Sequence, residues 1–202
     1  MKKIVIIGPE STGKSTLCEQ LAEHYKTSWC PEYAREYLLK NGTDYSFGDL
    51  LTIAKGQVAL EEKTGAAVKK MEEDAVTGGV KVGNRFTEGR RLTAAPLDHP
   101  FFIDTDMYVM KVWCEFVFDN CHRYILDQIV ERNYDLYLLC DVDLPWVKDE
   151  LREYPDLENR LKLYYFYKDI MVNQTVPWVS VSGDYETRLH TAIKSVDKLL
   201  KS

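Results

Sequence analysis

Residues 8–15 read GPESTGKS, and this stretch decides the fold. The apolar run IVII precedes it and TLCEQLAEHY follows it, which is the pattern of a buried strand, a tight loop and an amphipathic helix. The spacing matches G-x-x-x-x-G-K-[ST], in which the glycines permit a backbone path that points N–H groups at phosphate oxygens. The alternative is a glycine-rich turn that contains a lysine by chance. The complete spacing, between a strand and a helix, favours a phosphate-binding loop.

The loop positions predict how a nucleoside triphosphate and a metal ion are held. Lys14 places a positive charge between the β- and γ-phosphates, and the Ser15 hydroxyl is a ligand for Mg²⁺. The N-terminus of the helix that follows adds the positive end of its dipole. We therefore expect ATP and Mg²⁺ as cofactors. The expected nucleotide-binding residues are Gly8, Glu10, Ser11, Thr12, Gly13, Lys14, Ser15 and Thr16.

Strand-like and helix-like segments alternate along the whole chain. The expected strands are residues 4–7, 27–30, 101–106, 135–143 and the first part of 176–185. This alternation predicts an α/β fold with three layers, in which a mostly parallel five-stranded sheet lies between helices, as in P-loop NTPases of the nucleoside and nucleotide kinase type. The chain has 202 residues and no repeat or linker-like segment, so we expect one domain, 1–202.

Two segments depart from this regular pattern. The first is residues 66–99. The pattern fades over residues 71–100, which hold four glycines and mixed charges, and this favours a flexible insertion over an ordered lid or an oligomer contact. Residues 144–175 are expected to form a helical lid, with two helices that are interrupted near Pro155.

Composition and charge exclude several classes of function. The net charge is −6 and the densest cationic segment is the short RFTEGRR at 85–91, so nucleic acid is not expected as a partner. No apolar run approaches the ~20 residues that cross a bilayer. The five cysteines are dispersed, which is typical of a reducing compartment. Cys121 is followed by His122, but no second pair is present to complete a metal site. We expect a cytoplasmic protein without a membrane contact.

Acidic residues follow two of the expected strands. FFIDTD (101–106) places Asp104 at the end of its apolar run, where a carboxylate can hold Mg²⁺ together with Ser15. Asp106, just beyond the strand, is a second and weaker candidate for the metal, and capping of the next helix is an equal alternative for it. DVD at 141–143 is a weaker candidate for the metal, because loops after strands often end in a capping aspartate.

A charged turn follows the second expected strand. In PEYARE (31–36), Glu32, Arg35 and Glu36 share one helical turn next to the ligand crevice of an open α/β sheet. The simpler interpretation is a solvated cluster of ion pairs. The position favours a carboxylate that accepts a hydroxyl proton, with Arg35 steadying the substrate.

Arginines and aromatic residues complete the candidate site. In LREYPDLENR, Arg152 and Arg160 are candidates for closing over a transferring phosphoryl group, and two surface arginines among acids are the alternative. Most aromatic side chains are expected in the core, while Tyr108 and Trp113 are candidates for stacking on a flat ring of the substrate.

Taken together, these segments resemble a known family. GPESTGKSTL, PEYAREY, GQ at 56–57, FIDTD, WVKDELR and the later Arg160 occur in the order found in the ribosylnicotinamide kinase domain of the NadR type. The resemblance covers most of the chain apart from 66–99. Where that family tends to carry an aromatic residue before the glutamate, this chain has Cys30-Pro31, so a stacking contact is missing or comes from Trp29. The adenylyltransferase and DNA-binding parts of such proteins are not expected here.

The resemblance implies ATP-dependent phosphorylation of nicotinamide riboside to the mononucleotide, a step of NAD salvage. It implies a catalytic set in which Arg152 and Arg160 are lid residues. The expected catalytic residues are Lys14, Glu32, Asp104, Arg152 and Arg160. Glu32 is favoured as the base, because nucleoside kinases of similar architecture use an acid just after the second strand. The expected substrate-binding residues are Glu32, Arg35, Asp106, Tyr108 and Trp113. The expected metal ligands are Ser15 and Asp104.

Two other functions stay open at this point. A kinase for another nucleoside or small molecule would use the same machinery, because the choice of acceptor depends on the shape of the pocket. An ATP-binding regulatory module without a small-molecule acceptor is the second alternative. A small riboside is the expected partner, and a homo-oligomer is possible.

Overall fold

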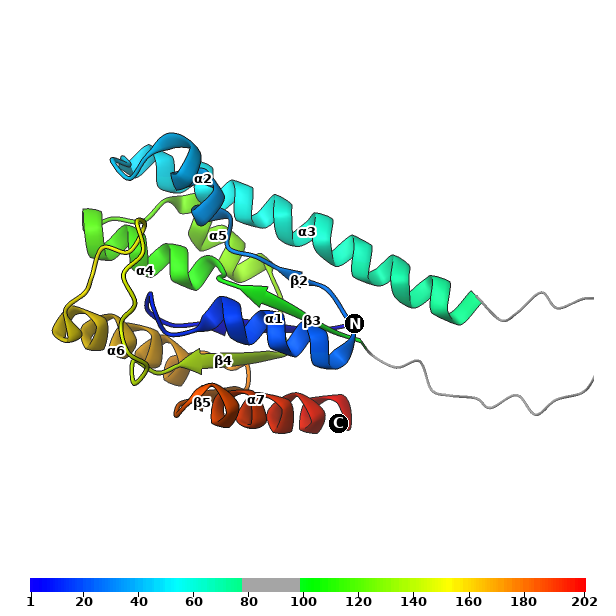
Figure 1. Cartoon of the computed structure of the whole chain (residues 1–202). Helices are drawn as coiled ribbons and strands as arrows, with labels where there is room; N and C mark the ends of the chain where they lie inside the picture. The colour runs from blue at the N-terminus through cyan, green and yellow to red at the C-terminus, as the bar shows by residue number, and fades with distance from the viewer. Residues whose placement is uncertain (78–98) are drawn as a thin grey trace, which may run out of the picture.

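The computed structural model describes residues 1–77 and 99–202, and both ends of the chain lie at one side of the molecule (Figure 1). Among these residues a single sheet contains the strands β1 (Lys2–Ile7), β2 (Trp29–Cys30), β3 (Pro100–Asp104), β4 (Leu136–Cys140) and β5 (Trp178–Val181). The spatial order is β2-β3-β1-β4-β5, and every neighbouring pair is parallel. The expected parallel five-stranded sheet is confirmed.

β1 is the central strand of this sheet. Ile6 is paired with Asp104 of β3 on one side and with Leu138 of β4 on the other. Residues 4–7 are fully buried on both faces, which explains why the strand reads as a continuous apolar run without alternation. Because all strands run in the same direction, their carboxyl ends meet at one edge of the sheet (Figure 1).

Helices cover both faces of the sheet and form the outer layers. They are α1 (Lys14–Tyr25), α2 (Tyr33–Asn41), α3 (Phe47–Thr77), α4 (Met107–Phe118), α5 (Arg123–Glu131), α6 (Leu157–Asn173) and α7 (Tyr185–Leu200). α1 and α7 pack on one face, in a core that includes Leu21 and Val196. α3, α4 and α6 pack on the other face, in a core that includes Val68, Val112 and Leu163. α2 and α5 pack against α3 and α4 farther out.

Helix α3 is longer than the sequence pattern indicates. The flexible insertion was expected to begin at residue 66, whereas residues 66–77 continue α3. Val68 is buried in the core cluster that also contains Phe101, and the Lys and Glu residues around it have high helix propensity. The expected boundary is therefore wrong, and the rest of the expected insertion, apart from His99, lies outside the described residues.

The segment between β4 and α6 also differs from the prediction. Two helices were expected in 144–175, but residues 141–156 are irregular and only α6 is helical. Proline residues at 145 and 155 remove backbone donors, and backbone N–H groups of this segment are bonded to side chains elsewhere in the chain. We call residues 141–156 the lid segment; it rises from the end of β4 toward α2 before it descends to α6 (yellow in Figure 1).

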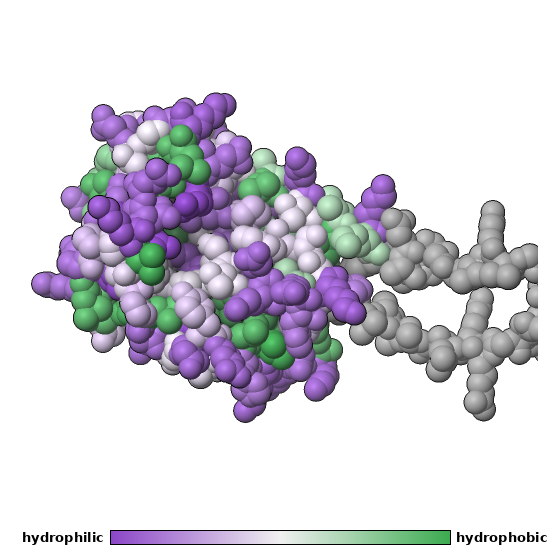
Figure 2. Space-filling view, viewed as in Figure 1, coloured by the Kyte–Doolittle hydropathy of each residue, from purple (hydrophilic) through white to green (hydrophobic). Residues whose placement is uncertain are grey.

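The surface is consistent with the composition. On the face drawn in Figure 2, hydrophilic side chains predominate and hydrophobic ones form separate small areas. Across residues 1–77 and 99–202, no helix has both the length and the apolar character that a membrane span requires.

Candidate active site

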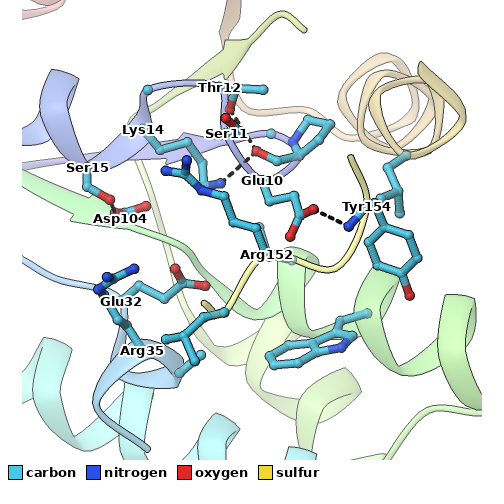
Figure 3. A pocket seen from close by; sticks show the side chains of 18 of the residues that line it. Glu10, Ser11, Thr12, Lys14, Ser15, Glu32, Arg35, Asp104, Arg152 and Tyr154 are labelled. Carbon is cyan, nitrogen blue, oxygen red and sulfur yellow. Dashed lines mark hydrogen bonds between the residues drawn. The ribbon is translucent and has the colours of Figure 1, made fainter. Parts of the chain in front are cut away.

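A cavity of about 340 Å³ lies at the carboxyl edge of the sheet. Its walls come from the loop 8–15, the start of α2, the end of β3, α4, α6 and the lid segment (Figure 3). The expected residues that line it are Gly8, Glu10, Ser11, Thr12, Gly13, Lys14, Ser15, Thr16, Glu32, Arg35, Asp104, Trp113 and Arg152. The structure therefore gathers most of the sequence-predicted site in one place.

The backbone of the loop adopts the path that its glycines predict. Gly8 has a φ of 142° and Gly13 a φ of 77°, and Ser11 also lies in the left-handed region. A Cβ atom on Gly8 would lie 2.7 Å from the carbonyl oxygen of Cys140, so β4 leaves no room for a side chain there. Thr12 Oγ1 donates to the Pro9 carbonyl at 2.8 Å and fixes the turn.

Two buried arginines hold the loop from behind. Arg160 donates to the carbonyl of Ser11 at 3.3 Å, and Arg188 donates to the carbonyl of Thr12 at 3.0 Å. In a trans peptide the N–H of the next residue points away from the carbonyl, so these bonds turn the amides of Thr12 and Gly13 to the opposite side. Both side chains are almost completely buried.

This arrangement changes the role expected for Arg160. It was predicted as a lid residue over the phosphoryl group, but it is not among the residues that line the cavity. Its Nη2 donates to the carbonyls of Ser11 and Leu144, and burial lowers its pKa. Arg188 was missed by sequence reasoning, because an arginine on an amphipathic C-terminal helix carries no local signal of a buried partner.

Lys14, Ser15 and Asp104 meet on the floor of the cavity. Lys14 Nζ donates to the Pro9 carbonyl at 2.9 Å, and the Ser15 hydroxyl donates to Asp104 Oδ2 at 2.5 Å (Figure 3). Burial raises the pKa of Asp104, and the charge of Lys14 opposes that rise. A carboxylate and a hydroxyl oxygen are the donors that Mg²⁺ prefers, and the buried charge of Asp104 favours a nearby cation. The residues present fit that ion.

Glu32 faces the same floor from the start of α2. Although it occupies the N-cap position of that helix, its side chain accepts no capping hydrogen bond from α2. Burial, followed by the negative charge of Asp104, raises the pKa of Glu32 to about 7, against the opposing effects of Lys14 and Arg35. A carboxyl group with such a pKa is suited to proton transfer near neutral pH.

Gln57 connects the two segments that carry these acids, the start of α2 and the end of β3. Its Oε1 accepts a hydrogen bond from the backbone N–H of Tyr33 at 2.7 Å. Its Nε2 donates to the carbonyls of Thr105 at 3.1 Å and Asp104 at 3.3 Å. Thr105 has a φ of 76°, which is strained for a β-branched residue. From the sequence, the GQ pair at 56–57 served only as a sign of family resemblance. The hydrogen bonds of Gln57 show that its side chain joins α2 to β3.

Asp106 and Tyr108 lie away from the cavity. Asp106 accepts hydrogen bonds from the backbone N–H groups of Tyr108 and Val109, so it is the N-cap of α4, and it also accepts one from the hydroxyl of Tyr137. Burial raises its pKa to about 6. Neither residue is among those that line the cavity, where both had been expected to bind substrate. Asp106 therefore has the helix-capping role that was the alternative expectation for it.

The lid segment is joined to both sides of the cavity. On the side of α2, Arg35 forms an ion pair with Asp149 at 3.0 Å. On the side of the phosphate-binding loop, Ser11 Oγ accepts from the backbone N–H of Val147 at 3.0 Å. Arg152 donates to the Val147 carbonyl, and its side chain runs along the cavity toward that loop (Figure 3).

Aromatic and acidic side chains line the part of the cavity that adjoins the last residues of the lid segment. Trp113 Nε1 donates to the hydroxyl of Tyr45 at 2.9 Å, and that hydroxyl donates to Glu153 Oε2 at 2.9 Å. Burial raises the pKa of Glu153. Trp29, for which a stacking role was considered, also lines the cavity. Other aromatic lining residues are Phe116, Tyr154 and Tyr167.

The fold and the loop define the class of protein. A parallel sheet with order β2-β3-β1-β4-β5 and a phosphate-binding loop after its central strand make this a P-loop NTPase fold of the nucleoside and nucleotide kinase type. A family model described as an AAA domain matches residues 3–188. The chain therefore belongs to that AAA domain family.

Curated relatives extend the comparison. The chain is 23% identical over 201 residues to the trifunctional NAD biosynthesis/regulator protein NadR of Escherichia coli (strain K12), and equally to that of Salmonella typhimurium. These matches cover 99% of this chain but only 43% of each relative. The chain thus spans less than half the length of the relatives it matches.

Solved structures share the fold. A crystal structure of a NadR protein in complex with NR matches all of this chain and 50% of that chain, with a TM-score of 0.72 and 21% identity. A thymidylate kinase from Ehrlichia chaffeensis matches over 98% of both chains, with a TM-score of 0.57 and 14% identity.

Proposed function

We propose that the protein is an ATP- and Mg²⁺-dependent kinase that transfers the γ-phosphoryl group to the 5′-hydroxyl of a riboside. The observation that carries this proposal is the convergence of Lys14, Glu32 and Asp104 on one cavity. Glu32, whose pKa is raised, lines this cavity with Lys14 and Asp104, where its carboxylate can accept the proton of an attacking hydroxyl group.

The mechanism follows from the roles that these groups can play. Glu32 accepts the proton of the acceptor hydroxyl group. At the same time the hydroxyl oxygen forms the new bond to the γ-phosphorus, and the bond between that phosphorus and the leaving ADP breaks. Lys14 and Arg152 stabilise the negative charge on the migrating phosphoryl oxygens. Mg²⁺ bound by Ser15 and Asp104 would supply further positive charge to the phosphates. The lid segment excludes water, which favours transfer to the acceptor over hydrolysis.

The acceptor end of the cavity favours a particular kind of riboside. Glu32 and Glu153 line the cavity together with Trp29 and Trp113. Of its two lining arginines, Arg35 is paired with Asp149 and Arg152 extends toward the phosphate-binding loop. Acids and aromatic faces attract a flat cation and disfavour a phosphorylated acceptor. Nicotinamide riboside carries a positively charged ring and no phosphate.

We therefore propose nicotinamide riboside as the acceptor and nicotinamide mononucleotide as the product, within NAD salvage in the cytoplasm. The similarity to NadR and to its complex with NR supports this choice, although identity is 23% or below. A kinase for a different nucleoside would keep every step and change only the contacts to the base.

The experiment is ADP release from Mg·ATP in the presence of a panel of ribosides that includes nicotinamide riboside, uridine, adenosine and deoxyadenosine. We expect large stimulation by nicotinamide riboside, with mononucleotide detected by mass spectrometry. Thymidine monophosphate is the matched phosphorylated acceptor and should give no stimulation.

The other outcomes are informative. Stimulation by a neutral nucleoside alone would retain the kinase and refute the charge argument for the acceptor. ATP turnover that no riboside stimulates would refute the proposed transfer and favour the regulatory module.

A further inference from the structure

Glu10 occupies an unusual position for an acid. It lies within the loop expected to surround phosphate groups, where a negative charge opposes the binding of a triphosphate. Its charge also contributes to the raised pKa of Glu32. The backbone of Glu10 belongs to the loop that is expected to bind the nucleotide, but its carboxylate cannot donate hydrogen bonds to phosphate oxygens. The cost of this charge calls for another role.

The contacts of Glu10 indicate that role. Its Oε2 accepts a hydrogen bond from the backbone N–H of Glu153 at 3.0 Å. Its Oε1 accepts one from the backbone N–H of Tyr154 at 2.5 Å (Figure 3). One carboxylate thus binds two consecutive amides of the lid segment, 143 and 144 residues away in the chain. Hydrogen bonds to a charged acceptor are stronger than those between neutral groups.

These amides adjoin Arg152, the cationic residue of the lid segment that lines the cavity. Arg152 directly precedes Glu153, so the two bonds fix the backbone from which its guanidinium extends into the cavity. Val147 provides a second connection to the loop, because its N–H donates to Ser11 and its carbonyl accepts from Arg152. Arg152 is consequently held between two contacts that both come from the phosphate-binding loop.

We propose that Glu10 is a positioning residue that fastens the lid segment to the phosphate-binding loop and thereby places Arg152 on the transferring phosphoryl group. This inference rests on the proposed kinase function. A bound triphosphate adds like charge beside Glu10 and penalises conformers that point its carboxylate at the phosphates. The lid amides then remain its favourable partners, so nucleotide binding reinforces the closed lid.

The test compares Glu10→Ala with Glu19→Ala, which removes the same charge from an exposed site on α1. Glu10→Ala should lower kcat at least tenfold and leave the Kd of Mg·ATP unchanged or smaller, since the lost group repels phosphate. Glu10→Gln retains one acceptor oxygen and should recover part of kcat. Glu19→Ala should match the parent protein in both quantities.

A double-mutant cycle with Arg152 separates positioning from a merely structural effect. If Glu10 acts through Arg152, Glu10→Ala combined with Arg152→Ala should be no slower than Arg152→Ala alone. Additive losses would overturn the proposal. So would a Glu10→Ala variant whose defect lies in Mg·ATP affinity with kcat intact.

Hydrogen exchange decides the same question without turnover. Peptides that cover residues 147–154 should exchange faster in Glu10→Ala than in Glu19→Ala, and added Mg·AMP-PNP should restore less protection. Equal exchange in the two variants would refute the proposal that Glu10 fastens the lid segment to the phosphate-binding loop. If the parent protein phosphorylates no riboside, the proposed function fails, and this measurement still determines whether Glu10 holds the lid segment.

Discussion

The two acids on the cavity floor carry a cost in stability that single substitutions can measure. Glu32 has a pKa of about 7 in the folded protein against an ordinary 4.5, so the folded state binds more protons than the unfolded state between these values. Its contribution to stability is present below pH 4.5 and is lost as the pH rises through 7. A group that the protein retains against this penalty is expected to have a function.

Glu32→Gln should therefore stabilise the protein at pH 8, by on the order of 1–3 kcal/mol, and have little effect at pH 4.5. The same variant should lose most of its kcat, because the amide cannot accept the hydroxyl proton. Thermal unfolding monitored by circular dichroism at the two pH values tests the first statement. Glu36→Gln, an exposed neighbour on α2, is the control and should change neither quantity. A stabilisation of equal size at both pH values would refute the assigned pKa.

Gln57 offers a second test, which concerns hydrogen-bond polarity. In Gln57→Glu the oxygen that accepts from Tyr33 is kept, but a carboxylate oxygen faces the carbonyls of Asp104 and Thr105. We expect a loss of about 2–4 kcal/mol in the free energy of unfolding and a lower kcat, since these bonds tie the Glu32 turn to β3. Gln57→Met loses the bond from Tyr33 as well as the two donated bonds, but it adds no charge opposite the carbonyls and should be milder in urea denaturation. A tolerated Gln57→Glu would contradict the polarity seen here.

Among the helices, α3 shows how one substitution can have opposite effects at two positions. A Cβ on Gly56 would lie 2.1 Å from the ring of Tyr33 in α2, whereas a Cβ on Gly48 would have only the Ser46 hydroxyl near it, at 3.6 Å. The absence of a side chain at Gly56 lets α2 lie close to α3, and this contact helps to set the orientation of the turn that carries Glu32.

Gly48→Ala should raise the free energy of unfolding by about 0.5–1 kcal/mol, because alanine restricts the unfolded chain and favours the helix. Gly56→Ala should instead lower it by about 1–3 kcal/mol and reduce kcat, because the Tyr33 ring must move. Paired urea titrations measure both. A Gly56→Ala variant as stable and as active as the parent protein would show that the α2–α3 contact does not constrain the site.

The elements also explain which parts of the fold were predictable. β1, α1 and β4 follow from local patterns, because a buried parallel strand is apolar throughout and a surface helix has an apolar stripe. The end of α3 and the irregular lid segment did not follow. Their structure depends on where Val68 is buried and on side chains of Glu10 and Ser11 that accept lid hydrogen bonds.

At the scale of the whole molecule, nucleotide binding should raise the free energy of unfolding, and this rise tests where the nucleotide binds. Mg·AMP-PNP at 100 times its Kd should stabilise the fold by ~2.7 kcal/mol, which corresponds to a rise in Tm of about 5–10 °C for a domain of this size. Lys14→Ala should abolish most of this rise without unfolding the protein, because Lys14 contacts only the Pro9 carbonyl among the hydrogen bonds of the described chain. Differential scanning fluorimetry provides the readout. Exposed Lys63→Ala is the control, and an unchanged rise in Lys14→Ala would place the nucleotide elsewhere.

The sequence by itself determined the phosphate-binding loop, the parallel sheet around it and the acids at the strand ends. These features are local, since loop spacing, apolar runs and the position after a strand are written in consecutive residues. Only the tertiary structure decided that Asp106 caps α4, that Arg160 and Arg188 hold the loop from behind, and that Glu10 grips the lid segment. Arg188 and Thr12 are 176 residues apart. Such partners depend on how the helices pack on the sheet, and no local pattern encodes that distance.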